Sequence, residues 1–289
     1  MSTKKNFAIV ALALLFSACV SGSNARAANP PTNAEELVAL HLDSIATAPV
    51  RAGLKTRVAQ GPVEYKILVG GVGTLEGKAQ IASDGKKLVF MMKLPNNEYR
   101  GEQFIFNGEK DSVAFSTARQ ARSSLGSFVF VQDAIIREGL LGGLLTTAWP
   151  LLNLDERKAK VSFDGLKKMD GQDLYLLHYH PHKSTDLEIN LYFDPQTFRH
   201  VKTIFSYSVS QGLTLGGDRA TARQQQTRYR LTEKFSDFKT VDGVTLPTHD
   251  NIQFSQELQN GGTTLNEWDL KGLDVSNNVP VDARNFEVK

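Results

Sequence analysis

Two-residue turn signals divide most of this chain into short segments of alternating polarity. Leu88, Phe90 and Met92 fall on every second position of one such segment, and Ile189, Leu191 and Phe193 do so in another. The turn signals are Asp84-Gly85, Asn107-Gly108, Asp164-Gly165, Asp170-Gly171, Asp194-Pro195, Asp242-Gly243 and Asn260-Gly261. Dipeptides of this kind suit the tight turns of antiparallel hairpins. From about Thr56 onward we therefore expect a large antiparallel sheet that curls or closes. A doubly wound α/β fold is disfavoured, because the strands do not alternate with long helices.

One helix is expected ahead of the sheet. Asn33 followed by Glu36 is typical of a helix N-terminus, because the Asn side chain can accept the first free backbone N–H groups. Apolar residues from Leu37 to Ile45 recur at helical spacing behind it. An amphipathic helix is predicted to open the folded part of the chain.

The first residues have the pattern of an export signal. Lys4 and Lys5 precede an apolar run, 7–16, that is too short to span a membrane. The segment 16–19 resembles a bacterial lipobox, which implies a signal peptide of residues 1–18, a lipid on the sulfur of Cys19 and a flexible tether over 19–33. Cleavage after Ala27 is the alternative, and it would discard Cys19.

The charge and cysteine content exclude two classes of protein. Lys4 and Lys5 account for the formal charge of +2, so the rest of the chain carries equal numbers of basic and acidic side chains. A nucleic-acid partner is therefore not expected. Because Cys19 is the only cysteine, the mature chain has no internal disulfide and depends on packing for its stability.

An apolar segment interrupts the strand pattern at about 124–154. Residues 139–152 are nearly uncharged, and the segment is expected to form one or two short helices. So many apolar residues have to be buried, yet they are too few to span a bilayer. The segment could be a permanent plug of the sheet, or a movable lid over a ligand cavity in which Gly139, Gly142 and Gly143 allow the backbone to bend.

Two turn motifs carry a resemblance to a known family. The sequence Tyr-Phe-Asp-Pro-Gln-Thr at 192–197 and the strand entry Val-Asp-Gly-Val-Thr-Leu-Pro-Thr at 241–248, together with the opening helix and the apolar insertion, resemble the LolA/LolB-like outer-membrane lipoprotein-sorting superfamily. The resemblance covers about 34–289 as a single domain. It implies a mainly β (α+β) fold, a half-open β-barrel lidded by helices, whose cavity holds acyl chains of lipoproteins or other lipids.

The resemblance also implies a set of residues that would line the cavity. Inward apolar residues suit a packed core as well as a cavity wall, so both interpretations stay open. The candidates are Phe90, Met92, Phe104, Phe106, Phe115, Leu140, Leu144, Leu145, Trp149, Tyr175, Leu177, Phe193, Phe205 and Tyr207.

Metal binding is the competing chemistry. His178 and His180 would share one face of a strand, with His182 beyond Pro181 and two acidic side chains, Asp186 and Glu188, nearby. A histidine-rich hairpin end is more often a solvated surface. No Gly-x-Ser-x-Gly motif supports nucleophilic catalysis.

The sequence therefore favours a monomeric, noncatalytic carrier or chaperone of lipid or lipoprotein acyl chains that needs no cofactor. We expect it in the periplasm, anchored to the outer membrane through Cys19, with a soluble periplasmic or secreted protein as the alternative. A sensor or protein-binding module on the same fold, or a metal-binding periplasmic protein, are the other functions left open.

Overall fold

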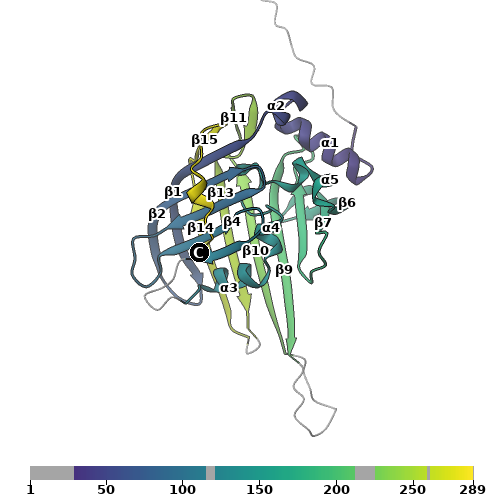
Figure 1. Ribbon diagram of the computed structural model, residues 1–289. Coiled ribbons are helices and arrows are strands. Elements are labelled where there is room, and N and C mark those ends of the chain that lie inside the picture. Colours follow the sequence, from purple (N-terminus) through teal and green to yellow (C-terminus); the bar gives the residue numbers. More distant parts are fainter. Residues whose placement is uncertain (1–28, 115–120, 212–224, 259–260, 289) are drawn as a thin grey trace, which may run out of the picture. The chain divides into compact units, whose positions relative to one another are not determined.

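The computed structural model describes residues 29–114, 121–211, 225–258 and 261–288. Within the unit Pro31–Lys289, thirteen strands of the described residues form one antiparallel sheet (Figure 1). They are β1 (Thr56–Val69), β2 (Thr74–Asp84), β3 (Lys87–Lys93), β4 (Gly101–Phe106), β5 (Asp111–Ala114), β6 (Lys160–Met169), β7 (Gln172–His180), β8 (Glu188–Phe193), β9 (His200–Gln211), β10 (Gln225–Ser236), β13 (His249–Glu257), β14 (Thr263–Leu270) and β15 (Asp274–Asn277). A separate hairpin consists of β11 (Lys239–Val241) and β12 (Val244–Leu246).

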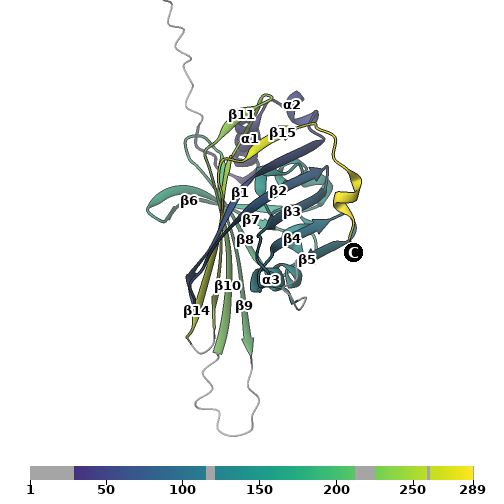
Figure 2. The same cartoon turned by 90° about the vertical axis from the view of Figure 1, so that its left-hand side faces the viewer.

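The sheet is not closed into a barrel. Its strand order is β5-β4-β3-β2-β1-β14-β13-β10-β9-β8-β7-β6, and β15 pairs with the first part of β1. β5 and β6 end this order, and no pairing joins them within the described part of the chain. Figure 2 shows β2–β5 turned at an angle to β9 and β10, so the sheet is curved. The mainly β class and the half-open sheet expected from the sequence are confirmed.

Most of the turn signals lie where hairpins were predicted. Gly85, Gly171 and Gly243 have positive φ angles of 56°, 83° and 77° in the turns between consecutive strands, a conformation that glycine adopts without steric cost. Asp164-Gly165 is the exception. It lies inside β6, where the pairing with β7 shifts register between Phe163 and Leu166, so this glycine, with φ of 71°, marks a β-bulge and not a turn.

Helix α1 (Ala34–Ile45) opens the unit as expected. The Asn33 side chain accepts the backbone N–H of Glu36 at 2.8 Å, and the Glu36 carboxylate accepts the backbone N–H of Thr32 at 2.7 Å. These reciprocal bonds satisfy donors at the helix N-terminus. The short helix α2 (Ala48–Ala52) follows before β1.

The apolar insertion connects the two edges of the sheet, β5 and β6. We use "insertion" for 124–157, which contains α3 (Ser124–Val131), α4 (Ala134–Arg137), the 3-10 turns η1 (Gly143–Leu145) and η2 (Pro150–Leu152), and α5 (Leu154–Arg157). The segment is more broken than the one or two helices expected. Gly139 has a positive φ of 68°, and a Cβ there would lie 2.2 Å from the carbonyl oxygen of Ala148, so the chain turns back too tightly for a continuous helix.

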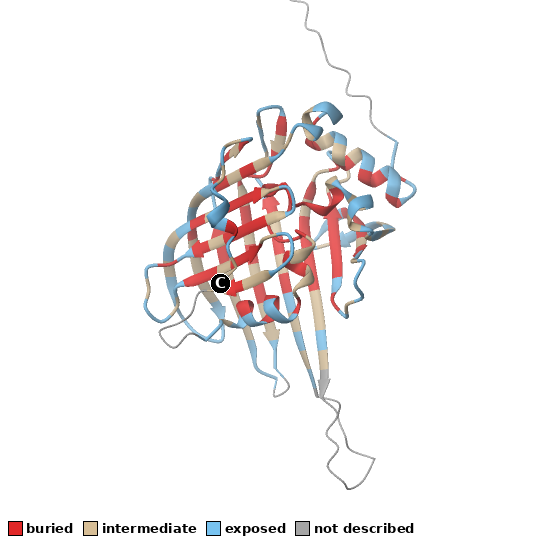
Figure 3. Cartoon of the chain, in the orientation of Figure 1, coloured by how far each residue is buried: buried red, intermediate tan, exposed pale blue. Residues whose placement is uncertain are grey.

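The main core lies between the insertion and the sheet face that the insertion covers, which we call the concave face. Alternating residues of the strands point to this face, and they join the insertion in one apolar cluster. Figure 3 marks the buried positions of the strands and of the insertion in red. A smaller cluster lies on the opposite, convex face, where Phe286 of the C-terminal 3-10 turn η3 (Ala283–Phe286) packs on Ala82, Val89 and Ile105. The curved sheet and the insertion thus enclose a continuous apolar interior.

Candidate functional site

The centre of the insertion is a tight turn, Gly142–Thr146, which we call the central turn. It lies over the concave face, because a Cβ on Gly142 would be 3.2 Å from the ring of Phe90 and one on Gly143 would be 2.9 Å from the ring of Phe235. Two fully buried polar side chains of the sheet, Glu233 and Arg57, hold the turn from opposite ends.

Glu233 of β10 accepts the backbone N–H of Gly142 at 2.8 Å through Oε1. Its other oxygen, Oε2, has no partner among the described residues, and neither oxygen of Asp250 on the adjacent strand β13 has one. Burial raises the pKa of Glu233 to about 8. Burial also raises the pKa of Asp250 well above its ordinary value, and the nearby charges of Glu233 and Asp269 add to this. The pair is therefore held as neutral acids near neutral pH.

Arg57 of β1 holds the other end of the central turn. Its Nη1 donates to the carbonyl oxygen of Leu144 and, at 3.4 Å, to that of Thr146, while Nε donates to Oδ1 of Asn277 at 2.8 Å. Burial lowers the pKa of Arg57 to about 10, and Nη2 has no partner within the described ranges. The guanidinium stays charged at neutral pH, although no carboxylate in the described part of the chain forms an ion pair with it.

A cluster of histidines and Trp149 fixes the next part of the insertion. The ring of Trp149 stacks on His200 of β9, with 4.5 Å between ring centroids, and its indole N–H donates to Nε2 of His41 at 3.2 Å. Nδ1 of His41 lies 3.0 Å from the carbonyl oxygen of Phe198, which can only accept, so His41 carries its proton on Nδ1 and is neutral. Burial lowers the pKa of His41 to about 4.

Two hollows flank the insertion, one at each end. The α3 hollow, with a volume of about 380 Å³, lies between α3 and the concave face of β9, β10 and β13, and its apolar walls are Phe128, Val131, Tyr207 and Tyr229. The α1 hollow, with a volume of about 780 Å³, lies between α1 and the end of the insertion and includes Leu42 and Leu152. Both hollows adjoin the apolar interior, because Phe128 and Leu42 pack against the main core cluster.

The start of α3 is tied to the sheet by a third buried acid. Glu102 of β4 accepts hydrogen bonds from the hydroxyl groups of Ser123, the α3 N-cap, and Tyr99. Burial raises the pKa of Glu102 to about 7. The two hydroxyl donors lower this pKa and so partly offset the effect of burial.

The expected cavity residues lie together around the insertion. All except Phe115 and Tyr207 are buried, at most 8% exposed, in the main core cluster, so in this structure they are in contact with packed side chains. Tyr207 is partly buried and lines the α3 hollow. Phe115 and Cys19 lie outside the described residues.

The histidine hairpin has other partners than a metal. His178 and His180 are on one face of β7, with ring centroids 6.4 Å apart. Nδ1 of His178 bonds to Asn190 at 2.7 Å, and Nε2 of His180 bonds to Ser162 at 3.1 Å. In the described part of the chain, no three His, Cys, Asp or Glu side chains gather closely enough to hold a metal ion.

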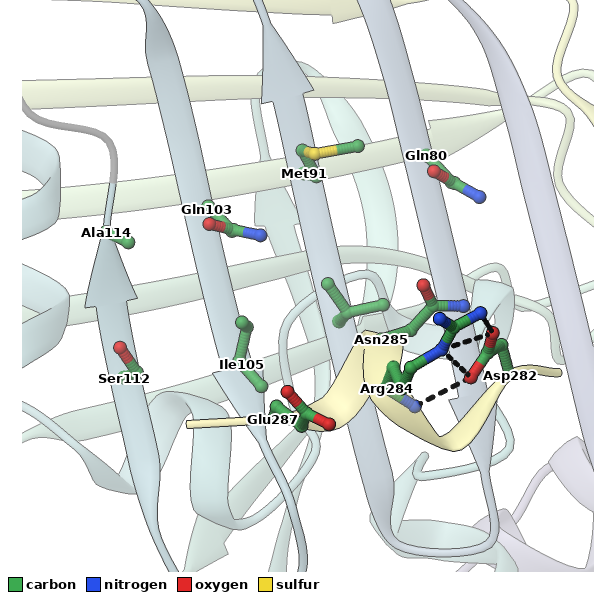
Figure 4. A pocket seen from close by; sticks show the side chains of 11 residues that line it. Gln80, Met91, Gln103, Ile105, Ser112, Ala114, Asp282, Arg284, Asn285 and Glu287 are labelled. Atoms are coloured by element: carbon green, nitrogen blue, oxygen red, sulfur yellow. Dashed lines mark hydrogen bonds and ion pairs between the residues drawn. The ribbon is translucent and has the colours of Figure 1, made fainter. Parts of the chain in front are cut away.

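A further hollow, of about 470 Å³, lies on the convex face between η3 and strands β2–β5 (Figure 4). Its floor includes Met91 and Ile105, and amide side chains such as Gln103 border it. The one cation in its wall, Arg284, is already paired with Asp282 at 2.5 Å. Glu287 adds a negative charge to the lining, so the described wall offers an anionic ligand no unpaired cation.

Sequence reasoning missed Arg57, Glu233 and Asp250. The signal that could have found them is a charged residue on the same strand face as apolar residues. Glu233, for example, alternates with Leu231 and Phe235, so all three point to one face of the strand. A charged residue at an inward position of a strand predicts a buried polar contact.

None of the helices within the described ranges has the length and apolar character that a membrane span requires.

Comparison with known proteins concerns the fold. No protein-family model and no curated protein matches the sequence. The structure is similar to a LolA superfamily protein from Nitrosomonas europaea, at 16% identity and a TM-score of 0.45, over 89% of this chain and 99% of that chain. It is also similar to a DUF1329 family protein from Desulfovibrio piger, at 15% identity and a TM-score of 0.44, over 88% of this chain and 96% of that chain. A third similar structure is that of an outer membrane lipoprotein-sorting protein domain from Vibrio parahaemolyticus, at 12% identity and a TM-score of 0.46, over 86% of this chain and 95% of that chain.

Similarity at these identities says nothing about a ligand. The arrangement itself is an open antiparallel sheet whose concave face is covered by an apolar helical insertion, which is the half-open architecture expected from the sequence.

Proposed function

We propose that this protein binds the acyl chains of lipids or lipoproteins, without catalysis, on the concave face of the sheet beneath the insertion. The observation that carries the proposal is the pair of hydrogen-bonded contacts that Arg57 and Glu233 make with the central turn, which we call the polar grip. Glu233 and Arg57 hold the turn, yet both leave buried polar atoms without partners among the residues that the structure describes.

The grip favours a movable insertion over a permanent core. A buried polar atom without a hydrogen bond costs about 1–3 kcal/mol, so the closed state holds unfavourable terms that an apolar plug would not contain. When the insertion moves outward, these groups become solvated. These unpaired polar atoms therefore reduce the free-energy difference by which the apolar contacts favour the closed state over an open one.

An acyl chain is the ligand that suits the uncovered face. Moving the insertion exposes a surface of Phe90, Phe205, Phe254 and similar side chains, which water solvates poorly. Each methylene group buried there is worth about 0.8 kcal/mol, so a chain of about 16 carbons gains roughly 12 kcal/mol on leaving water. That gain offsets the loss of the contacts of the insertion.

The α3 hollow is the proposed entrance. Phe128 of α3 packs on Tyr229 and Phe254, with ring centroids 5.8 Å and 5.2 Å apart, and Tyr207 continues this row of aromatic rings on β9. A row of rings that leads from an open hollow into the apolar interior gives an alkyl chain continuous apolar contact. A volume of about 380 Å³ accommodates part of such a chain before the insertion moves.

The direct test is native mass spectrometry of the purified mature protein, combined with lipid extraction. Co-purified acyl species in a fixed ratio to the protein support the proposal. A protein that carries no lipid and takes up neither a fatty acid nor the uncharged apolar fluorophore N-phenyl-1-naphthylamine contradicts it. Tyr207→Asp places a charge in the entrance and should reduce uptake, whereas Leu166→Asp, at an exposed position of β6, is the control.

We also propose a location at the cell envelope, with lipid on Cys19 holding the domain at a membrane. The proposal rests on the lipobox-like residues and the tether-like composition of 20–33.

A further inference from the structure

Glu233 and Asp250 lie side by side in the apolar interior. In the register of β10 and β13, Glu233 pairs with Ile252 and Phe235 pairs with Asp250, so the two acids are diagonal neighbours on the concave face. Both are fully buried, and three of their four carboxyl oxygens have no partner within the described residues. The fourth oxygen holds the N–H of Gly142 in the central turn.

Among the described residues, the groups around the pair offer no compensating positive charge. The central turn contributes only its backbone. Arg57 of β1 directs its donors to Leu144, Thr146 and Asn277. Burial lowers the pKa of His41 of α1 to about 4 and holds that of His200 of β9 well below its ordinary value, so both rings are neutral near neutral pH. Asp269 of β14 adds a further negative charge. Two ionised carboxylates could not both remain in this space.

We propose that Glu233 and Asp250 form a proton-binding pair that keeps the insertion closed while it is protonated and allows the insertion to open when the protons leave. This role is independent of the ligand and goes beyond the proposed function. On opening, water reaches the two acids, each O–H bond breaks with its electron pair left on the carboxylate, and the protons pass to water or buffer. Closing takes the same protons back.

The sign of the effect follows from this balance. The closed state binds more protons than the open state, so rising pH favours opening. For each proton released, the ratio of open to closed molecules rises about tenfold per pH unit, and for two protons up to about a hundredfold. The pair would therefore couple opening of the insertion to the alkalinity of the compartment.

The test measures opening without a ligand. Trp149 is fully buried in the insertion, and the only other tryptophan is Trp268. In a Trp268→Phe background, quenching of Trp149 by acrylamide, an uncharged quencher, reports opening from pH 6 to pH 9. We expect quenching to rise steeply across this range in the parent protein and to stay nearly flat in Glu233→Gln/Asp250→Asn, whose amides cannot ionise.

Glu102→Gln is the matched control, because Glu102 is equally buried but holds Ser123 and not the central turn. It should keep the steep rise. A flat profile in the parent protein overturns the proposal, and so does a steep profile that survives the double substitution or disappears only in Glu102→Gln. If the double variant does not fold, as judged by circular dichroism, Asp250→Asn alone should halve the pH slope, and an unchanged slope is again contradictory.

Uptake of N-phenyl-1-naphthylamine, uncharged over this range, separates the two proposals. Opening that depends on pH without uptake at any pH leaves the proton-binding pair intact and contradicts the proposed function. Uptake that is equal from pH 6 to pH 9, with quenching also constant, supports the proposed function and contradicts the proton-binding pair.

Discussion

His41 and Trp149 are joined by a buried hydrogen bond, in which the indole N–H donates to Nε2 of the imidazole at 3.2 Å. The bond links α1 to the insertion, and it requires an unprotonated Nε2. This hydrogen bond between α1 and the insertion therefore depends on the charge of the His41 ring.

This bond predicts a loss of stability in acid. Burial lowers the pKa of His41 from 6.5 to about 4, so the unfolded chain binds a proton between these values and the folded chain does not. The free energy of unfolding should therefore fall as the pH decreases from about 6.5 to about 4, with a contribution of about 3 kcal/mol from His41. Urea unfolding at several pH values measures it. His41→Gln should lower stability at pH 7 and flatten the acid limb, and equal pH slopes in both proteins would count against the assignment.

Removing the arginine grip should loosen the central turn. Arg57→Met leaves the carbonyl oxygens of Leu144 and Thr146 without their donor inside the protein, at a cost of about 1–3 kcal/mol for each group that stays buried. We expect a lower melting temperature together with faster uptake of an apolar fluorophore, because the closed state loses more than the open state. Arg284→Met is the control, since Arg284 is exposed. An Arg57→Met protein that melts like the wild type and takes up ligand at the same rate would exclude the grip.

A charge on the central turn distinguishes a lid from a plug. Leu144 and Leu145 are fully buried against the concave face. If the insertion opens, Leu144→Glu should abolish uptake of a fluorescent fatty acid, because a carboxylate does not enter an apolar cavity, while the melting transition stays close to that of the wild type. In a permanent plug the same change should cost more than about 3 kcal/mol and unfold the domain. Leu145→Glu repeats the test, and the exposed Leu166→Glu on β6 serves as the control.

The histidine hairpin should be indifferent to substitution. His178→Gln/His180→Gln keeps polar side chains at positions that bond to Asn190 and Ser162, so we expect a change in stability of no more than about 0.5 kcal/mol and an unchanged metal content. Elemental analysis and thermal melts check this. Stoichiometric zinc or copper that disappears with the double substitution would establish a metal site instead.

Attachment to a membrane should depend on one sulfur atom. Cys19→Ser should abolish metabolic labelling with palmitate and release the protein from the membrane fraction, because only the cysteine thiol can carry the lipid. Cys19 is the only cysteine, so no other thiol can substitute. Membrane association that is unchanged in Cys19→Ser would contradict lipidation.

Local patterns were sufficient to predict the fold class. The Asp-Gly turns at Gly85, Gly171 and Gly243 have the backbone angles that their sequence requires, and Asn33 caps α1 through its own side chain. Asp164-Gly165 shows the limit, because the same dipeptide fits a bulge inside a strand. Only the pairing partner, β7, decides between the two, and pairing is not local in sequence.

The polar grip could not be predicted in the same way. Arg57 meets Leu144 because β1 and the insertion are brought together by the curvature of the sheet, and Glu233 meets Asp250 through a register that depends on every turn between β10 and β13. Sequence indicates that a charge lies at an inward position. It does not indicate which backbone group, from another part of the chain, comes to meet that charge.

The place of β14 in the sheet has a consequence for how the protein reaches its folded state. β14 lies between β1 and β13, so that Val63, near the beginning of the chain, pairs with Leu270, near its end. A chain that leaves a ribosome or a translocation pore with its N-terminus first exposes the edge of β1 long before its partner arrives. Pairing so distant in sequence folds slowly, and an unpaired strand edge invites association with other chains. A truncation that removes β14 would likewise expose the edge of β1, and it would leave the centre of the sheet, not its rim, without a strand.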